Sequence, residues 1–433
     1  MSDPIVLPDF PDGTEFEELV AAHYQCNGFY VDRNIIEREE KEVLELDVVT
    51  TAYTSEIPEI TLVEVKSGGW GFSDIFKVAG WLQYNGIERG VLVVKEARNQ
   101  LSFYEDKAST VNVETQVIDK GGVYDEIVPE HCDEFDVGAW RYAYWVERKL
   151  IKYLKDYKSS RQDLDGPKAI DQYYQNINGG IFFLPSTVER LETLYNLYKR
   201  RPNLSARCGN ELNGNDFSED VDQIPTNIFA ETFYDCERNI IQVSTFTEYL
   251  ARLTILKNAV DFYLYEEAGD EERGDKILAQ IGDMKIMESN FLPNSFKDGL
   301  ERLSTHNYFE RYPIFWQWFI YVFGGFIIDD YKDREYRLLS RKTGIPVDEI
   351  ENALSVFDIL FPTSDDWIIE APNTNIRILR AFPMPFRGVG ANYRRQKYFG
   401  EDGEYEDFDV SGRYTVSDIV QWNNLAYEII DSG

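Results

Sequence analysis

Short apolar runs alternate with amphipathic helical patterns over residues 1–120, and this alternation constrains the fold more than any other feature of the chain. The patterns predict, in order, a helix over 12–28, strands over 29–36, 42–51 and 59–66, a helix over 73–86 and a strand over 90–94. A further helix and strand are expected to follow before residue 120. We therefore predict an α/β domain of order αβββαβ with a mixed central sheet.

The first of these helices carries signals at both ends. Thr14 is followed three residues later by Glu17, which is the spacing of a capping box. Gly28 is predicted to end the helix. Glu17 lies at the border of the apolar stripe, with Glu15 and Glu18 as neighbours, and Glu18 is expected to point farthest from that stripe.

The texture of the sequence changes at the acidic segment 129–136, after which long amphipathic helical patterns dominate. We predict three parts. They are the α/β domain over 1–130, a helical regulatory or oligomerisation region over 137–330, and a helix-turn-helix-like segment with an irregular α+β region over 331–433. The polar run 205–227 is predicted to be a loop.

Two stretches beyond residue 300 allow alternative interpretations. The apolar stretch 313–328 is shorter than the roughly 20 residues that span a bilayer, so we predict a buried helix, with an interfacial helix as the alternative. Residues 334–362 place Gly344 and apolar positions as a helix-turn-helix does. Acidic residues such as Glu349 on its second helix would repel phosphates, which favours a protein contact or a plain helical hairpin over DNA reading.

The composition of the chain limits which cellular compartment and which binding partners are expected. The chain has 433 residues, a net charge of −33, four cysteines without a C-x-x-C pair and three histidines, so neither a disulfide framework nor a structural zinc site is expected. No signal-peptide or membrane-spanning pattern is found, so we predict a cytoplasmic protein without a membrane partner. The acidity counts against binding a polyanion, and it also suits a basic protein partner.

Three charged residues lie in two neighbouring predicted strands. Glu64 and Lys66 share one strand face, and the hairpin can place Asp47 beside Glu64. Two carboxylates with a backbone carbonyl are oxygen ligands suited to Mg²⁺, and a lysine can orient or help deprotonate an attacking water. The alternative is that these are solvated charges on a strand, with Lys66 paired to a neighbouring carboxylate.

The order of the motifs resembles the PD-(D/E)XK nuclease superfamily, and within it the Mrr-type restriction endonucleases and the archaeal Holliday-junction resolvases. The segments that carry the resemblance are "GTEFEELVAAHYQCNGFYV", "LELDVV", "LVEVKSG" and "KVAGWLQYNGIERGVLVV", within residues 10–120. The resemblance implies a restriction-endonuclease-like fold for the N-terminal domain.

The resemblance also implies roles for individual residues. Asp47 and Glu64 would ligate Mg²⁺, for which Mn²⁺ can substitute, the Val65 carbonyl would complete the set, and Lys66 would act on the water. The helical glutamate of the family corresponds to Glu17, for which the capping box is the structural alternative.

Residues that contact substrate are less clearly marked. Many family members have a glutamine in the helix after the lysine, and here Lys77 or Gln83 can stand in for it. The basic residues near the motif that would form a DNA track are Arg33, Arg38, Lys41, Lys77, Lys95 and Arg98. Trp70 and Phe72 are interpreted as anchors of the loop after Lys66, with stacking on an unpaired base as the alternative.

The function that the resemblance implies is Mg²⁺-dependent hydrolysis of phosphodiester bonds in double-stranded DNA, in restriction or anti-phage defence. The helical region would sense a partner or assemble a homo-oligomer. Two alternatives stay open. One is a catalytically silent scaffold that binds a basic protein, and the other is a nuclease of RNA or of structured junctions.

Overall fold

The computed structural model describes residues 7–38, 41–54, 57–118, 132–160, 165–184, 187–199, 238–268, 289–328, 331–360, 368–370, 376–379, 386, 389–390, 393–394 and 397. The predicted loop over 205–227 and most of the irregular C-terminal region lie outside these residues.

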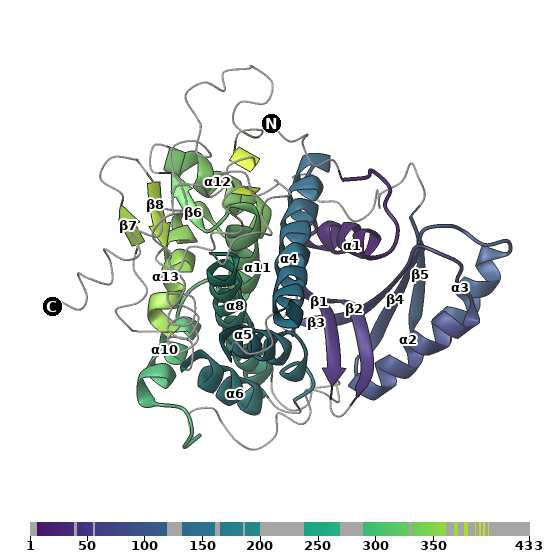
Figure 1. The fold of residues 1–433 in the computed structure, drawn as a ribbon, viewed down its shortest axis with the longest axis horizontal. Helices are drawn as coiled ribbons and strands as arrows, with labels where there is room; N and C mark the ends of the chain where they lie inside the picture. Colours follow the sequence, from purple (N-terminus) through teal and green to yellow (C-terminus); the bar gives the residue numbers. More distant parts are fainter. Residues whose placement is uncertain are drawn as a thin grey trace.

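Five strands form a mixed sheet in the order β1-β2-β3-β4-β5 (Figure 1). The strands are β1 (Tyr30–Arg38), β2 (Glu42–Ala52), β3 (Glu59–Lys66), β4 (Arg89–Val94) and β5 (Val113–Val117). The first three are antiparallel neighbours, and β4 and β5 run parallel to β3. Parallel neighbours need a crossover, which α2 (Phe72–Asn85) and α3 (Leu101–Ser109) provide. The predicted mixed α/β sheet is confirmed.

Helices cover both faces of this sheet. Val63 and Val65 of β3 share a core with α1 (Thr14–Cys26), whereas Leu62 packs with α2 on the opposite face, because side chains alternate along a strand. The approach of α2 is close. A Cβ atom at Gly90 of β4 would lie 2.7 Å from Cγ1 of Val78, so a glycine is needed there.

The ends of α1 show one wrong prediction and one confirmed prediction. Gly13, not Thr14, precedes the helix, and no side chain caps it, so the capping box is wrong. The loop after β3 holds this end instead, because the Gly13 N–H donates to Ser67 Oγ at 2.9 Å. At the other end, Gly28 has a φ of 82° directly after the Asn27 cap, as a helix stop requires.

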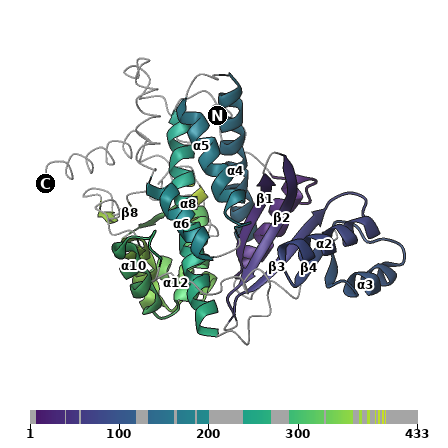
Figure 2. The ribbon, with the colours of Figure 1, turned by 90° about the horizontal axis from the view of Figure 1, so that it is seen from below.

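The remainder of the described chain is mainly helical, as predicted (Figures 1 and 2). Its elements are α4 (Glu134–Ser160), α5 (Asp165–Gln175), the π-helix η1 (Asn176–Gly180), α6 (Thr187–Lys199), α8 (Arg238–Ala268), α10 (Asn294–Ser304), η5 (Phe309–Arg311), α11 (Tyr312–Gln317), the π-helix η6 (Trp318–Val322), α12 (Lys332–Thr343), η8 (Val347–Glu349) and α13 (Ile350–Leu360). A small sheet has the order β6 (Phe326–Ile328), β8 (Ile376–Leu379), β7 (Ile368–Glu370).

One hydrophobic core joins the α/β and helical parts. It contains Phe16 of α1, Tyr30 of β1, Trp140 of α4 and Trp316 of α11. Helix α4 packs along α1, which lies between α4 and the sheet (Figure 1). The division into 1–130, 137–330 and 331–433 stays a prediction, and the apolar core continues across the first of its boundaries.

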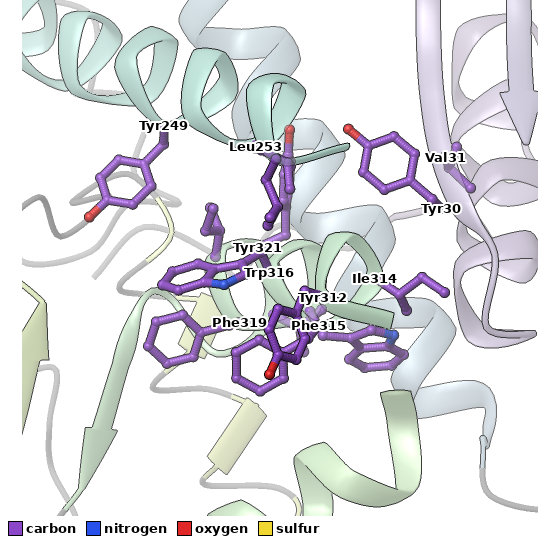
Figure 3. Close-up of a cluster of buried hydrophobic side chains, with 14 of the residues drawn as sticks. Tyr30, Val31, Tyr249, Leu253, Tyr312, Ile314, Phe315, Trp316, Phe319 and Tyr321 are labelled. Carbon is purple, nitrogen blue, oxygen red and sulfur yellow. The ribbon is translucent and has the colours of Figure 1, made fainter. Parts of the chain in front are cut away.

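Residues 313–327 are buried, as predicted, but the stretch is not one helix, because it passes from α11 through η6 into β6. Ile314 lies toward Tyr30 and Val31 in the buried cluster, to which Trp316 also belongs (Figure 3). Among the described residues, no helix is long and apolar enough to cross a membrane.

Gln317 is a buried polar side chain within this stretch, and it completes the edge of the large sheet. Its Nε2 donates to the Val31 carbonyl at 2.7 Å, and its Oε1 accepts from the Val31 N–H at 3.1 Å and from Gln25 Nε2 at 2.7 Å. A buried backbone group needs a partner, and here a side chain supplies what a sixth strand would have supplied.

The predicted helix-turn-helix pattern corresponds to α12, a turn at Gly344 with φ 75°, and α13. Leu339, Ile345 and Ile350 are fully buried, as the pattern requires. Helix α10 crosses α13 closely, since a Cβ atom at Gly299 would lie 2.3 Å from the Ile359 carbonyl oxygen. This contact places α13 within the protein and favours the helical-hairpin interpretation.

Replacing Gln317 by leucine is expected to lower the free energy of unfolding by about 3 kcal/mol, because the N–H and carbonyl of Val31 lose their partners while buried. Urea denaturation followed by tryptophan fluorescence measures the change. Gln83→Leu on the exposed surface of α2 is the control, with an effect within about 0.5 kcal/mol. Equal effects of the two substitutions would contradict the edge-pairing role.

Candidate functional site

Asp47 and Glu64 meet where β2 and β3 separate. The antiparallel register pairs Val48 with Val63, so its next step sets Asp47 opposite Glu64. Asp47 Oδ2 accepts a hydrogen bond from the Val65 N–H at 2.9 Å. A carboxylate therefore takes the place that a β2 backbone carbonyl would occupy in a regular ladder, and it is fixed against the backbone of β3.

The neighbouring strand is distorted at the same level. The β1–β2 register places Asn34 opposite Asp47, and Asn34 has a φ of 51°, in the left-handed region that asparagine tolerates better than most residues. The π-helix η1 holds this part of β1, because Asn178 Nδ2 donates to the Asn34 carbonyl at 2.6 Å. A Cβ atom at Gly179 would lie 2.1 Å from the Ile36 carbonyl oxygen, so η1 contacts the β1 backbone directly.

Glu64 is fully buried, and its two oxygens differ. Oε1 accepts from Lys66 Nζ at 2.5 Å and from Lys77 Nζ of α2 at 2.8 Å. Oε2 is buried and has no hydrogen-bond partner within the described part of the chain. The Lys77 ammonium also lies 4.0 Å from the centroid of the Trp81 ring, which fixes its approach. An unpartnered buried carboxylate oxygen is a position at which a bound cation would be favoured.

Several carboxylates lie close together at the site, and they are partly shielded from water. Burial, followed by the charges of Glu64 and Glu17, raises the pKa of Asp47 to about 7, against the hydrogen bond from Val65. Burial acts to lower the pKa of Lys66, but the hydrogen bond and charge of Glu64, together with the charges of Asp47 and Asp74, raise the pKa above its ordinary value. Lys66 therefore carries its positive charge at neutral pH.

Helix α4 binds two of the three glutamates in the first turns of α1. Burial, followed by the charge of Glu45, raises the pKa of half-buried Glu17. Glu18 is 2% exposed and accepts from Arg148 Nε of α4 at 2.7 Å, so the prediction that it points farthest from the apolar side is wrong. Glu15 also pairs with Arg148, at 3.1 Å. Both competitors of Glu17 are thus engaged in binding α1 to α4.

The residues predicted to contact substrate lie in different surroundings. Gln83 is exposed on α2. Lys95 Nζ donates to the carbonyl of Pro11 at 2.8 Å and holds the segment before α1. Arg98 is exposed beside the loop after β3, with its guanidinium carbon 5.7 Å from the centroid of the Trp70 ring. Of the four, Lys77 is the residue whose contact with Glu64 is direct.

Arg33 is directed inward, with 8% of its side chain exposed, so it does not lie on an open surface track as predicted. Its guanidinium pairs with Glu147 of α4 at 2.7 Å and lies 3.5 Å from the centroid of the Tyr144 ring. Arg38 is exposed at the end of β1 and lies 3.8 Å from Glu42. The first arginine therefore joins the sheet to the helical part, and the second remains on the surface.

The aromatic residues after Lys66 are anchors, as interpreted from the sequence. Trp70 is 2% exposed and its Nε1 donates to the Glu96 carbonyl at 2.9 Å. Phe72 stacks on Tyr104 with ring centroids 4.6 Å apart. The alternative in which Trp70 stacks on a base is wrong, because its ring is already covered.

Asp47 and Glu64 are a pair of carboxylates that could hold a metal. Within the ranges that the structure describes, no group of three or more histidine, cysteine, aspartate or glutamate side chains is placed to hold a metal ion. Asp47, Glu64 and a backbone carbonyl form a smaller oxygen set, and the unpartnered Oε2 of Glu64 fits that set.

Comparison of the chain with protein-family models, with curated proteins and with solved structures finds no match. The geometry of the candidate site is therefore what bears on its function.

Sequence reasoning missed three residues that hold the elements around the site in place, namely Asn34, Ser67 and Arg148. Asn34 has a local signal, since asparagine tolerates positive φ. Arg148 lies 130 residues after Glu18, and no local pattern relates the two.

In metal-free buffer with a chelator, the stability of the protein is expected to fall as pH rises from about 4 to about 7. The Asp47 carboxyl of the unfolded chain releases its proton near its ordinary pKa of 3.8, whereas the folded one holds it to about 7, so the folded state binds more protons between these values. Asp47→Asn removes this contribution and should be more stable than the wild type at pH 8 by at least about 1 kcal/mol, with the difference vanishing near pH 4. Denaturant titrations at each pH measure it. Parallel pH profiles for the two proteins would refute the assignment.

Proposed function

We propose that the chain is a Mg²⁺-dependent endonuclease of the PD-(D/E)XK type that hydrolyses phosphodiester bonds in DNA. The observation that carries the proposal is the meeting of Asp47 and Glu64 at the point where β2 and β3 separate, beside the ammonium of Lys66. A surface charge cluster needs no buried, unpartnered carboxylate oxygen, and Glu64 Oε2 is one.

Asp47, Glu64 and the carbonyl of Val65 are the residues that would hold the metal ion. When bound, Mg²⁺ supplies charge stabilisation at a phosphoryl oxygen and lowers the pKa of a water molecule. A cation at this position is supported by the raised pKa of Asp47, because it would offset the mutual repulsion of the buried carboxylates.

The lysines contribute positive charge on the α2 side of the sheet. Lys66 is half-buried and protonated at neutral pH, so it can orient a water or a phosphate oxygen by its charge. Lys77 shares the same Glu64 oxygen and can release it to contact a phosphate. Glu17 approaches from α1, and its charge acts on Asp47.

The biological setting follows from the resemblance to Mrr-type enzymes. We place the chain in restriction or anti-phage defence in the cytoplasm, with double-stranded DNA as substrate. The helical region would serve as a sensing or assembly part, through a homo-oligomer or a basic protein partner. The firm attachment of α4 to α1 supports such a role, because a change in α4 would reach Glu18 and its neighbour Glu17.

Two other functions share this geometry. A nuclease of RNA or of structured junctions would use the same residues. A silent scaffold is favoured by one observation: Lys66 and Lys77 both satisfy Glu64 Oε1, as a purely structural ion cluster would. In that case the net charge of −33 would recruit a basic protein.

Asp47→Ala, Glu64→Gln and Lys66→Ala are each expected to reduce Mg²⁺-dependent nicking of plasmid DNA by at least about 100-fold, because each removes a charge that acts on the water or the metal. Agarose electrophoresis of supercoiled plasmid measures the rate, and circular dichroism monitors the fold. Glu59→Ala, at the opposite end of β3, is the matched control and should retain activity. Activity retained in all three site variants would contradict the proposed nuclease function.

Millimolar Mn²⁺ is expected to raise the melting temperature of the wild type but not that of Asp47→Ala, because a ligand that binds only the folded state stabilises it. Differential scanning fluorimetry measures the shift, with Glu59→Ala again as control. A wild type that does not respond to Mn²⁺ would instead support the silent scaffold.

A further inference from the structure

A polar cavity of about 400 Å³ lies between the sheet and the helical part. Its walls come from α1, β1 and β2 on one side, and from α4, α5 and the π-helix η1 on the other. Five basic and four acidic side chains line it, an excess of one positive charge in a chain whose net charge is −33.

The bases are arranged in a row along α4. Arg148, Lys152 and Lys155 are spaced four and three residues apart, so they share one face of the helix, and all three line the cavity. At 1.5 Å per residue the row extends over about 10 Å. Each strand of a duplex carries a charge about every 3.4 Å of helix axis, and the phosphates of an extended single strand are more widely spaced, so the row spans at most about three phosphates.

The acidic residues of the cavity are largely engaged. Glu18 pairs with Arg148, Glu147 pairs with Arg33, and Asp171 accepts from Gln175 Nε2 at 2.9 Å. Glu18 thus offsets the charge of Arg148 within the row, and Glu147 offsets a base of the sheet.

The cavity borders the strands that carry the candidate site, although Asp47, Glu64 and Lys66 do not line it. Glu45 lines it and precedes Asp47 by two residues on β2, and Thr14 lines it where α1 begins. The same end of α1 is tied to the loop after Lys66 through Gly13 and Ser67. A strand lying along the row on α4 would thus reach the carboxylates where β2 and β3 separate.

Aromatic and amide groups complete the lining. Tyr174 of α5 is partly exposed in the cavity, and Asn176 and Asn178 of η1 lie next to it in sequence. A positive groove with an aromatic platform is the arrangement that binds single strands without base pairing.

We propose that this cavity binds the phosphodiester backbone of a single nucleic-acid strand and directs it to Asp47. The proposal rests on the proposed nuclease function and narrows its substrate to a strand that is unpaired where it enters. A volume of about 400 Å³ is that of a small-ligand site, so it admits a strand segment or a mononucleotide and not a duplex.

Binding of a fluorescent 12-nucleotide single strand, measured by anisotropy in chelator, tests the cavity without cleavage. The double variant Lys152→Glu, Lys155→Glu is expected to raise Kd at least tenfold and to reduce the slope of log K against log salt by about 1.4, since each phosphate contact contributes about 0.7. The matched control is Lys107→Glu, Arg341→Glu, which makes the same charge change at exposed sites on α3 and α12 and should bind as the wild type does. Equal binding by all three proteins, or none by the wild type, overturns the proposal.

Competition experiments distinguish the source of the phosphate. If a mononucleotide or inorganic phosphate displaces the strand at concentrations near the Kd of the strand, the cavity is a site for a small anion. If a duplex binds more tightly than the strand, nucleic acid is recognised at another surface of the protein. Either result overturns the proposal.

Parallel cleavage assays separate this proposal from the nuclease function. If strand binding depends on Lys152 and Lys155 but no cleavage is found, the proposed binding role of the cavity is supported and the proposed nuclease function is refuted. If the protein cleaves DNA and the double variant binds the strand as well as the wild type does, the nuclease function is supported and the binding role of the cavity is refuted.

Discussion

The hydrogen bond from the Val65 N–H to Asp47 Oδ2 is the interaction on which the candidate site depends. A regular ladder would pair two backbones at this level and turn both side chains away. A carboxylate that replaces the backbone carbonyl separates β2 from β3 and holds Asp47 beside Glu64. The penalty appears as the raised pKa of Asp47, because two carboxylates are held together in a partly dry place. Such local strain is kept when the surroundings over-determine it, and β1 and η1 supply those surroundings.

The helical part stabilises the sheet that carries the site. Gln317 closes the edge of β1 through both backbone groups of Val31, and Arg33 crosses from β1 to Glu147 of α4. These are buried polar contacts, which require defined geometry as well as burial. They lie beside the apolar core that is continuous from α1 to α11, and Arg33 and Glu147 also line the cavity at this junction.

The net negative charge of the chain argues less strongly against a nucleic-acid substrate when the positions of the individual charges are considered. Most long-range charge is screened beyond about 8–10 Å at moderate salt, so local clusters decide which ligands approach. The lining of the cavity has one more basic than acidic side chain, whereas the chain as a whole has a net charge of −33. Arg148 contributes to the row on α4 while it pairs with Glu18, so one residue links the cavity wall to the helix that carries Glu17.

The sequence by itself determined the elements of the sheet, the stop at Gly28, the turn at Gly344 and the proximity of Asp47 to Glu64, because periodicity, glycine conformation and hairpin register are local properties. The tertiary structure alone decided what local patterns cannot encode. It replaced the expected capping box by a contact to Ser67, and it buried Glu18 and drew Arg33 inward by packing α4 onto α1. Residues more than 100 positions apart set these last two environments, and burial, not residue type, determines whether a charge is a surface group or part of a site.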